Sequence, residues 1–205
     1  MTTITAPAPR ADYFHLMSSL PSSRVEVVRT HLELRDIGEL RPARLPSEPV
    51  ALRLHRPIRA AEYRTLYTLV GERWLWRDRL TWTDAELDRY LSSPDVHVWT
   101  LNVGGVTAGY FELQRHPDGT VEVMYFGLVE SFIGRGLGGW LLTRAVEESF
   151  AVGARRVILN TCTLDSPRAL PNYLARGFSI VREDRYVTTL PARGHLTLES
   201  AGEPA

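Results

Sequence analysis

The sequence predicts an α/β protein with a mixed, mostly antiparallel central sheet and helices on both faces of that sheet. Three observations predict this fold. Residues 96–129 read as three consecutive strands joined by short turns that contain glycine. Amphipathic helical patterns lie before and after these strands, at 60–70 and 137–150. An almost continuous apolar run at 155–162 then fits a strand that is buried on both faces beside a parallel neighbour.

The composition fits one domain with extensions, since the chain has 205 residues and 44% of them are hydrophobic. Lys plus Arg and Asp plus Glu both number 24, so no net charge favours nucleic acid or an anionic membrane as a partner. No apolar run reaches the roughly 20 residues that span a bilayer, and the N-terminus lacks the pattern of a secretory signal. Cys162 is the sole cysteine, which excludes an internal disulfide. We therefore expect a cytoplasmic protein, with a homodimer left open.

Three segments are expected along the chain. Residues 1–22 are rich in Ala, Pro, Ser and Thr, which predicts a mobile N-terminal segment, and 191–205 read as a C-terminal tail of the same kind. Residues 23–190 are expected to form a single domain whose first part, 23–48, is an N-terminal strand extension. Strands are predicted within it at 24–34 and 50–54.

The first predicted helix, 60–70, places four large side chains on one face: Tyr63, Leu66, Tyr67 and Val70. The second helix begins with a capping box, in which Thr83 is the N-cap and Glu86 lies three residues later. The connector between the two helices, 74–82, holds three of the five tryptophans.

The turn between the last two strands of the 96–129 segment sets the register of two glutamates. Its Pro-Asp-Gly sequence predicts a three-residue loop at 117–119. This loop fixes three cross-strand pairs: His116 with Thr120, Gln114 with Glu122, and Glu112 with Met124. Because side chains alternate with period two, Glu112 and Glu122 then share one face of the sheet. A two-residue loop would put them on opposite faces.

The last predicted helix follows the 155–162 strand. Ser166 and Pro167 fit an N-cap and a first helical residue, and Gly177 fits the stop. Pro171 removes one helical hydrogen bond, so either the first turn is irregular or the helix starts later than Ser166. Residues 178–190 close the chain as one or two strands.

Four glycines open the helix at 137–150: Gly134, Gly136, Gly138 and Gly139. Glycine costs conformational entropy, so this density indicates that a ligand approaches the backbone closely. The Walker A loop is excluded because no Gly-Lys-Ser/Thr ending is present. The dinucleotide pattern G-x-G-x-x-G is present, but it follows an antiparallel meander, and the next strand does not end at an acidic residue. A NAD-binding oxidoreductase is therefore a distant alternative.

The stretch resembles the pyrophosphate-binding loop of the GNAT acyltransferase superfamily, whose pattern is Arg/Gln-x-x-Gly-x-Gly/Ala. Here it reads Ile133, Gly134, Arg135, Gly136, Leu137, Gly138. Ile133 departs from the family's Arg or Gln. A second block, "SPRALPNYLARGF", resembles the family's Asn-x-x-Ala-x-x-x-Tyr-x-x-x-Gly-Phe motif, with Ser166 in place of the Asn. The resemblance covers about residues 50–190.

The resemblance implies a GNAT-like fold that binds acetyl-CoA and transfers its acetyl group by direct attack of an amine. Backbone amides of the loop and first helical turn, 134–139, would hold the pyrophosphate, and Arg135 would assist. The amide near Leu128, with Val129 beside it, would hold the acetyl carbonyl. Tyr173 holds the place of the family's thiolate-protonating tyrosine; packing on its helix is the alternative.

Two glutamates are candidates for the general base that must deprotonate the amine. Glu122 aligns with a base used by some members of the family, and a solvated strand-edge charge is its alternative. Glu112, flanked by Phe111 and Leu113, is the second candidate, and an ion pair with an arginine is its alternative. No ligand cluster for a metal is readable, and a buried thiol is the expected state of Cys162.

The acceptor is expected to be a small-molecule amine. In the family, the region of the first two helices walls the acceptor pocket, and here that region carries Trp74, Trp76 and Trp82. Their aromatic faces attract cations; core packing is the alternative. The leading function is an acetyl-CoA-dependent N-acetyltransferase. A catalytically weak acyl-CoA-binding or regulatory module is the other class.

Overall fold

The computed structural model describes residues 22–191. The predicted N-terminal segment 1–22 and tail 191–205 therefore lie outside the described residues, apart from Ser22 and Pro191. Contacts divide the chain into two units, Val28–Asp184 and a second unit whose described residues are 22–27 and 185–191. Every candidate site residue lies in Val28–Asp184, and the predicted domain boundaries stay predictions.

The central sheet has seven strands in the order β2-β3-β4-β5-β6-β1-β7. From β2 to β5 the pairs are antiparallel, and β5 and β6 are parallel, as the apolar run predicted. β1, expected only as an extension, lies between β6 and β7 and pairs with β6 in antiparallel fashion. The strands are β1 (Ser22–Leu34), β2 (Val50–His55), β3 (Val96–Val103), β4 (Val106–Arg115), β5 (Thr120–Leu128), β6 (Arg156–Cys162) and β7 (Ser179–Pro191).

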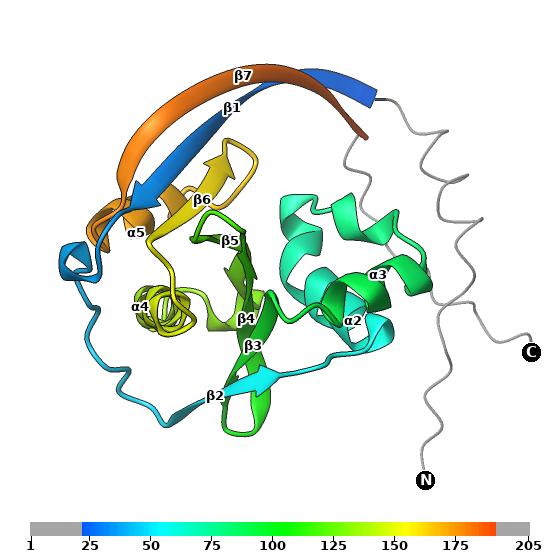
Figure 1. The fold of residues 1–205 in the computed structure, drawn as a ribbon. Coiled ribbons are helices and arrows are strands. Elements are labelled where there is room, and N and C mark those ends of the chain that lie inside the picture. The colour runs from blue at the N-terminus through cyan, green and yellow to red at the C-terminus, as the bar shows by residue number, and fades with distance from the viewer. Residues whose placement is uncertain (1–21, 192–205) are drawn as a thin grey trace, which may run out of the picture. The chain divides into compact units, whose positions relative to one another are not determined.

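Helices cover both faces of the β3–β5 part of the sheet, with α4 on one side and α2 and α3 on the other (Figure 1). The α-helices are α2 (Ala60–Gly71), α3 (Asp84–Leu91), α4 (Leu137–Ala151) and α5 (Ala169–Ala175). Short 3₁₀ segments are η1 (Ile37–Glu39), η2 (Glu72–Trp74), η3 (Asp78–Leu80) and η4 (Glu130–Phe132). None of the helices within residues 22–191 combines the length and hydropathy that would cross a bilayer.

Two helix ends test the local predictions. The capping box of α3 is present, because Thr83 Oγ1 accepts from the Glu86 amide and the Glu86 carboxylate accepts from the Thr83 amide. α5 begins at Ala169, so Ser166 as its N-cap is wrong and the later start is correct. The later start leaves Pro171 in the first turn. N–H groups in the first turn have no partner within the helix, so the missing N–H of Pro171 costs no helical hydrogen bond.

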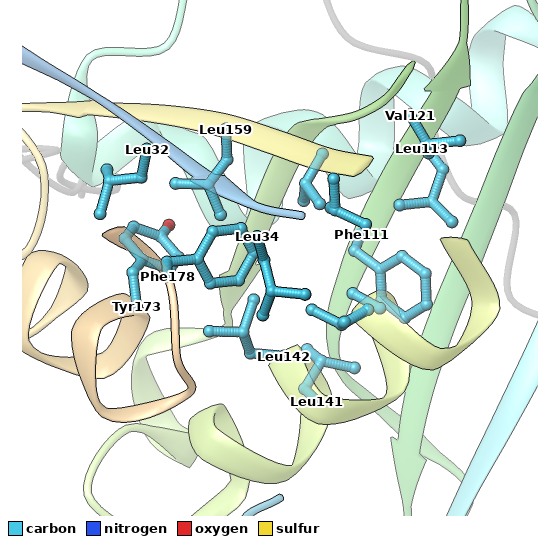
Figure 2. Packing of buried hydrophobic residues seen from close by; sticks show 14 of the residues in the cluster. Leu32, Leu34, Phe111, Leu113, Val121, Leu141, Leu142, Leu159, Tyr173 and Phe178 are labelled. Carbon is cyan, nitrogen blue, oxygen red and sulfur yellow. The ribbon is translucent and has the colours of Figure 1, made fainter. Parts of the chain in front are cut away.

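Each helical layer buries its own apolar core. The core under α4 and α5 gathers leucines of β1, β4, β6 and α4 around Phe111, Tyr173 and Phe178 (Figure 2). The core under α2 and α3 is built from Tyr63, Tyr67, Leu87 and Tyr110, with tryptophans packed at its margin. The two faces of β4 therefore supply both cores, since Phe111 points to one and Tyr110 to the other.

The β4–β5 hairpin confirms two predicted pairs and corrects the third. The His116 amide donates to the Thr120 carbonyl at 2.8 Å, and Gln114 lies opposite Glu122. Glu112 lies opposite Tyr125 instead of Met124, because the register shifts between Glu112 and Leu113. This bulge in β5 lies beyond Val123, so Glu112 and Glu122 still share the face that α2 and α3 cover.

Candidate active site

The glycine loop turns directly into α4. Gly134 and Gly136 have φ of 90° and 78°, the left-handed region that glycine adopts without strain. Gly136 is the N-cap, and it offers no side chain to the first-turn amides. The first turn also contains no acidic residue. Its N–H groups lack intrahelical partners and carry the positive end of the helix dipole, so the residues present fit a pyrophosphate.

The last two glycines of the loop differ in what surrounds them. A Cβ on Gly139 would lie 2.5 Å from Arg176 Nη1, the end of a flexible side chain, and 3.1 Å from Ala43 Cβ, so a side chain there would crowd atoms of the protein itself. A Cβ on Gly138 would meet only Leu128 Cδ1, at the ordinary contact distance of 3.7 Å. The fold itself therefore does not require glycine at position 138.

The end of β5 presents backbone groups that no neighbouring strand uses. β5 pairs with β6 at Thr120, Val121 and Glu122, and no further β5–β6 pair follows within the described residues. On the β4 side, the Val129 amide donates to the Ala108 carbonyl at 2.9 Å, which fixes the alternation of the ladder. Antiparallel pairs alternate, so Phe126 and Leu128 direct their N–H and C=O groups away from β4. The sequence prediction named Leu128 and Val129 but not Phe126, and the Val129 amide is already used by its bond to Ala108.

Tyr173 lies next to this unpaired edge. Its ring is 6.1 Å from the ring of Phe126 and 6.2 Å from that of Phe178, and 6% of the residue is exposed (Figure 2). The neighbouring Asn172 donates to the Gly138 carbonyl at 3.3 Å, which ties α5 to the first turn of α4. Burial raises the pKa of Tyr173, and Asp165 raises it further, so its hydroxyl stays protonated at neutral pH.

Arginines that the sequence did not single out converge on the glycine loop. Arg168 Nη1 lies 3.6 Å from the position of a Cβ on Gly134, and Arg176 Nη1 approaches Gly139. Neither arginine forms an ion pair with another residue of the described chain. Arg135, the predicted phosphate ligand, instead pairs with Glu48 and lies over the Phe132 ring at 4.8 Å. The available signal was position, since Arg168 and Arg176 flank the helix of the second motif block.

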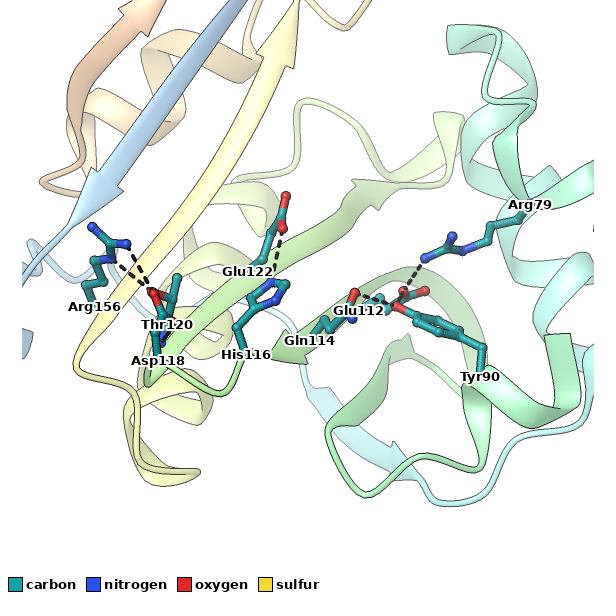
Figure 3. Close-up of polar contacts among 9 residues, drawn as sticks. All are labelled: Arg79, Tyr90, Glu112, Gln114, His116, Asp118, Thr120, Glu122 and Arg156. Carbon is teal, nitrogen blue, oxygen red and sulfur yellow. Dashed lines mark hydrogen bonds and ion pairs between the residues drawn. The ribbon is translucent and has the colours of Figure 1, made fainter. Parts of the chain in front are cut away.

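Glu112 is fully buried and each of its oxygens is engaged; Figure 3 shows the contacts with Arg79 and Tyr90. Its Oε2 accepts from the Tyr63 hydroxyl, and its Oε1 accepts from the Tyr90 hydroxyl and from Arg79 Nη2 at 3.2 Å. The Tyr90 hydroxyl also lies 3.2 Å from Gln114 Oε1. The arginine ion pair, the alternative given for Glu112 from sequence, is therefore what the structure contains.

Arg79 lies over three aromatic rings, one of which, Trp82, was expected to attract an acceptor. Its guanidinium carbon lies 4.2 Å from the ring centroid of Trp82, 4.4 Å from that of Tyr90 and 5.3 Å from that of Tyr125. We call these three rings with the Glu112 carboxylate the cation cage. Burial alone would lower the pKa of Arg79, but Glu112 and the tyrosines raise it overall, so the guanidinium is charged.

The three predicted acceptor tryptophans do not form one group. Trp76 and Trp82 pack at the margin of the core under α2 and α3, and both are half-buried. Trp76 meets the rings of Tyr67 and Tyr125 at 5.6 and 5.1 Å. Trp74 lies outside that core, beneath the Arg73 guanidinium at 5.3 Å. Only Trp76 and Trp82 are brought to the face that Glu122 shares.

Glu122 is the more accessible of the two candidate bases. Its side chain is 21% exposed, and its contact within the described residues is with His116 Nε2, at 3.3 Å (Figure 3). Phe126 lies four positions after Glu122, about 13 Å along an extended strand. A proton would therefore have to reach Glu122 through water or along an extended acceptor.

Two other features of the described chain take no part in this arrangement. A pocket of about 430 Å³ lies near the start of β5 and β6, and its lining contains none of the candidate residues: Glu33, Arg35, Asp118, Thr120, Arg155 and Arg156. Within residues 22–191, no three His, Cys, Asp or Glu side chains are placed to hold a metal ion.

Comparison with known proteins identifies a family for this architecture. Residues 63–178 match the model of the acetyltransferase (GNAT) family. N-alpha-acetyltransferase RimI of Mycobacterium tuberculosis is 30% identical over 128 residues, which are 60% of this chain and 78% of RimI. Mycothiol acetyltransferase of Corynebacterium aurimucosum is 40% identical over 79 residues; the match covers 37% of this chain and only 26% of that protein.

Solved structures show the same fold at lower identity. A GCN5-related N-acetyltransferase from Kribbella flavida matches with a TM-score of 0.56 at 20% identity, over 92% of this chain and 66% of that one. Another from Sphaerobacter thermophilus matches with a TM-score of 0.57 at 17% identity, over 87% of this chain and 56% of that one.

Proposed function

Since this chain belongs to the acetyltransferase (GNAT) family, we propose that it transfers the acetyl group of acetyl-CoA to the amine of a small molecule. The observation that supports this most is the meeting of two backbone features. The amides of the α4 first turn are open beside Gly136, and the unpaired amides of Phe126 and Leu128 lie next to them. The first turn of α4 and the end of β5 lie close together, because a Cβ on Gly138 would lie 3.7 Å from Leu128 Cδ1.

In the proposed complex, the first-turn amides of α4 bind the pyrophosphate. Arg168 and Arg176 add positive charge on the α5 side of the loop. The N–H groups of Phe126 and Leu128 point to where the acetyl carbonyl would lie, so they stabilise the oxyanion that forms when the amine attacks.

Tyr173 and Glu122 act from opposite faces of the sheet. Tyr173 belongs to the core under α4 and α5, whereas Glu122 lies on the face that α2 and α3 cover. Groups on the two faces can reach a common atom only where β5 and β6 no longer pair, beyond Glu122 and Ile158. Tyr173, kept protonated by burial, donates to the departing thiolate. Glu122 accepts the amine proton through water.

Glu112 is not proposed as a base. Both of its oxygens already accept hydrogen bonds, and one of them is paired with the Arg79 guanidinium. The acceptor is proposed to lie along Trp76 and Trp82, as a small amine with an apolar portion. A cytoplasmic location and a homodimer stay predictions.

A panel of small amines tests this function. The purified chain is incubated with acetyl-CoA and one amine at a time, and the release of free thiol is measured. The baseline is the thiol released by hydrolysis in the absence of amine. We expect release above the baseline for amines with an apolar body. If coenzyme A stabilises the chain against heat but none of the amines raises thiol release above the baseline, the binding or regulatory module is favoured instead.

A further inference from the structure

The cation cage has the composition of a ligand-binding site for a cation. Three aromatic faces surround one guanidinium, and a fully buried carboxylate, Glu112, supplies the counter-charge. Proteins bind quaternary ammonium and similar ligand cations with this combination of rings and negative charge. Here the chain's own Arg79 is the occupant.

The need for a cation is set by Glu112, and Arg79 meets it incompletely. A carboxylate that is 0% exposed cannot remain ionised without a positive partner. Arg79 Nε is also buried, and it has no hydrogen-bond partner within the described residues. A buried donor without a partner is costly. The cage therefore requires a positive group, but its geometry does not use every donor of this arginine.

The cage adjoins the face that the proposed function assigns to the acceptor. Tyr125, one of its three rings, lies on β5 between Glu122 and the amides of Phe126 and Leu128. Trp82, another of its rings, belongs with Trp76 to the same core margin. A ligand cation that approaches the transfer centre from the α2 and α3 side would meet these rings.

We propose that Arg79 fills a preformed cation subsite of the acceptor face and thereby sets the specificity of the enzyme. With Arg79 in the cage, the acceptor is an amine with one cationic centre and an apolar body. A second ammonium or guanidinium group finds its aromatic and anionic partners already taken. Removal of the Arg79 side chain opens the subsite to that second group. The specificity rests on the proposed function, whereas cation binding by the cage does not.

The cage is tested first by adding the missing cation back. The Tm of Arg79→Ala is measured in the presence of guanidinium ion at millimolar concentration, and in the presence of sodium ion or neutral urea at the same concentration. We expect guanidinium alone to raise the Tm, by about 3–6 °C at ten times its Kd. The double variant R79A/E112Q should lose this response, because the counter-charge is gone. Arg77→Ala, an exposed neighbour, should show no response.

Specificity is tested with two acceptors of matched length, butylamine and agmatine, which differ in a terminal guanidinium. The unaltered chain should favour butylamine in kcat/KM, and Arg79→Ala should shift the ratio at least ten-fold towards agmatine. An unchanged ratio in R79A, or equal Tm responses to guanidinium and urea, overturns the proposal. If no amine is acetylated by the unaltered chain, the proposed function fails, and the Tm experiment alone decides the cage.

Arg79→Ala leaves Glu112 without a partner and can prevent folding. The variant is then refolded by dilution from urea into buffer with either guanidinium or sodium ion, and coenzyme A-dependent stabilisation reports the native state. Recovery in guanidinium alone supports the proposal. Equal recovery in both salts, or recovery in neither, overturns it.

Discussion

Replacement of Gly138 by alanine separates the stability of the fold from the binding of coenzyme A. Gly138 is the second residue of α4, its φ is not positive, and a Cβ there meets only Leu128 Cδ1 at 3.7 Å. Alanine is about 0.5–1 kcal/mol better than glycine inside a helix. Without ligand, Gly138→Ala should therefore raise the Tm by roughly 1–4 °C for a chain of this size.

The same methyl group should obstruct the ligand. It would stand beside the first-turn amides, where the proposed pyrophosphate lies against the backbone. At 100 times its Kd, coenzyme A should stabilise the unaltered chain by about 2.7 kcal/mol, which corresponds to a Tm rise of roughly 5–11 °C. In Gly138→Ala this rise should fall to a small fraction. Thermal unfolding with and without coenzyme A measures both effects, and calorimetric titration gives the Kd.

A second glycine supplies the opposite control. Gly105 lies in the β3–β4 turn with φ of 82° and nothing within 4 Å of an added Cβ. Alanine there adopts a strained left-handed conformation, so Gly105→Ala should lower the Tm and leave the coenzyme A response intact. A Gly138→Ala chain that keeps the full coenzyme A response would refute the placement of the pyrophosphate over α4.

Three other perturbations have expected outcomes. Tyr173→Phe should lower kcat roughly 10²-fold with little change in the KM for acetyl-CoA, and near-normal turnover would leave Tyr173 as a packing residue. Glu122→Gln should lower kcat at an unchanged Tm, whereas Glu112→Gln should destabilise the fold by about 3–5 kcal/mol because Arg79 loses its partner. Urea unfolding measures the stability of each variant and thiol release measures its activity; the reverse pattern would exchange the roles of the two glutamates. Burial raises the pKa of three fully buried tyrosines above the unfolded value of 10: that of Tyr67 to about 12, and those of Tyr63 and Tyr110 well above 10. Their contribution to the free energy of unfolding is complete below pH 10 and declines above it, because only the unfolded chain releases these protons. The three tyrosines together lose about 4 kcal/mol of this contribution at pH 11. An unfolding free energy that is the same at pH 9 and pH 11 would contradict this prediction.

The sequence by itself determined those features whose cause is local. The left-handed glycines before α4, the capping box at Thr83 and the three-residue loop at 117–119 each depend on residues within a few positions of one another. The apolar periodicities likewise placed α2, α4 and the parallel strand β6, because burial of one face, or of both, leaves its own pattern in the sequence. For α5 the sequence left two starts open, at Ser166 or later, because an N-cap pattern also occurs in turns, and the structure has the later start.

Only the tertiary structure decided the features that join distant residues. The bulge in β5 puts Tyr125 opposite Glu112, and the insertion of β1 between β6 and β7 uses a strand more than 100 residues away from either partner. The pairing of Arg79 with Glu112 spans 33 positions, and the sequence offered several other arginines for that role. Which charged side chains form an ion pair depends on how whole helices and strands pack. This packing leaves no periodic pattern in the sequence between the two residues that it brings together.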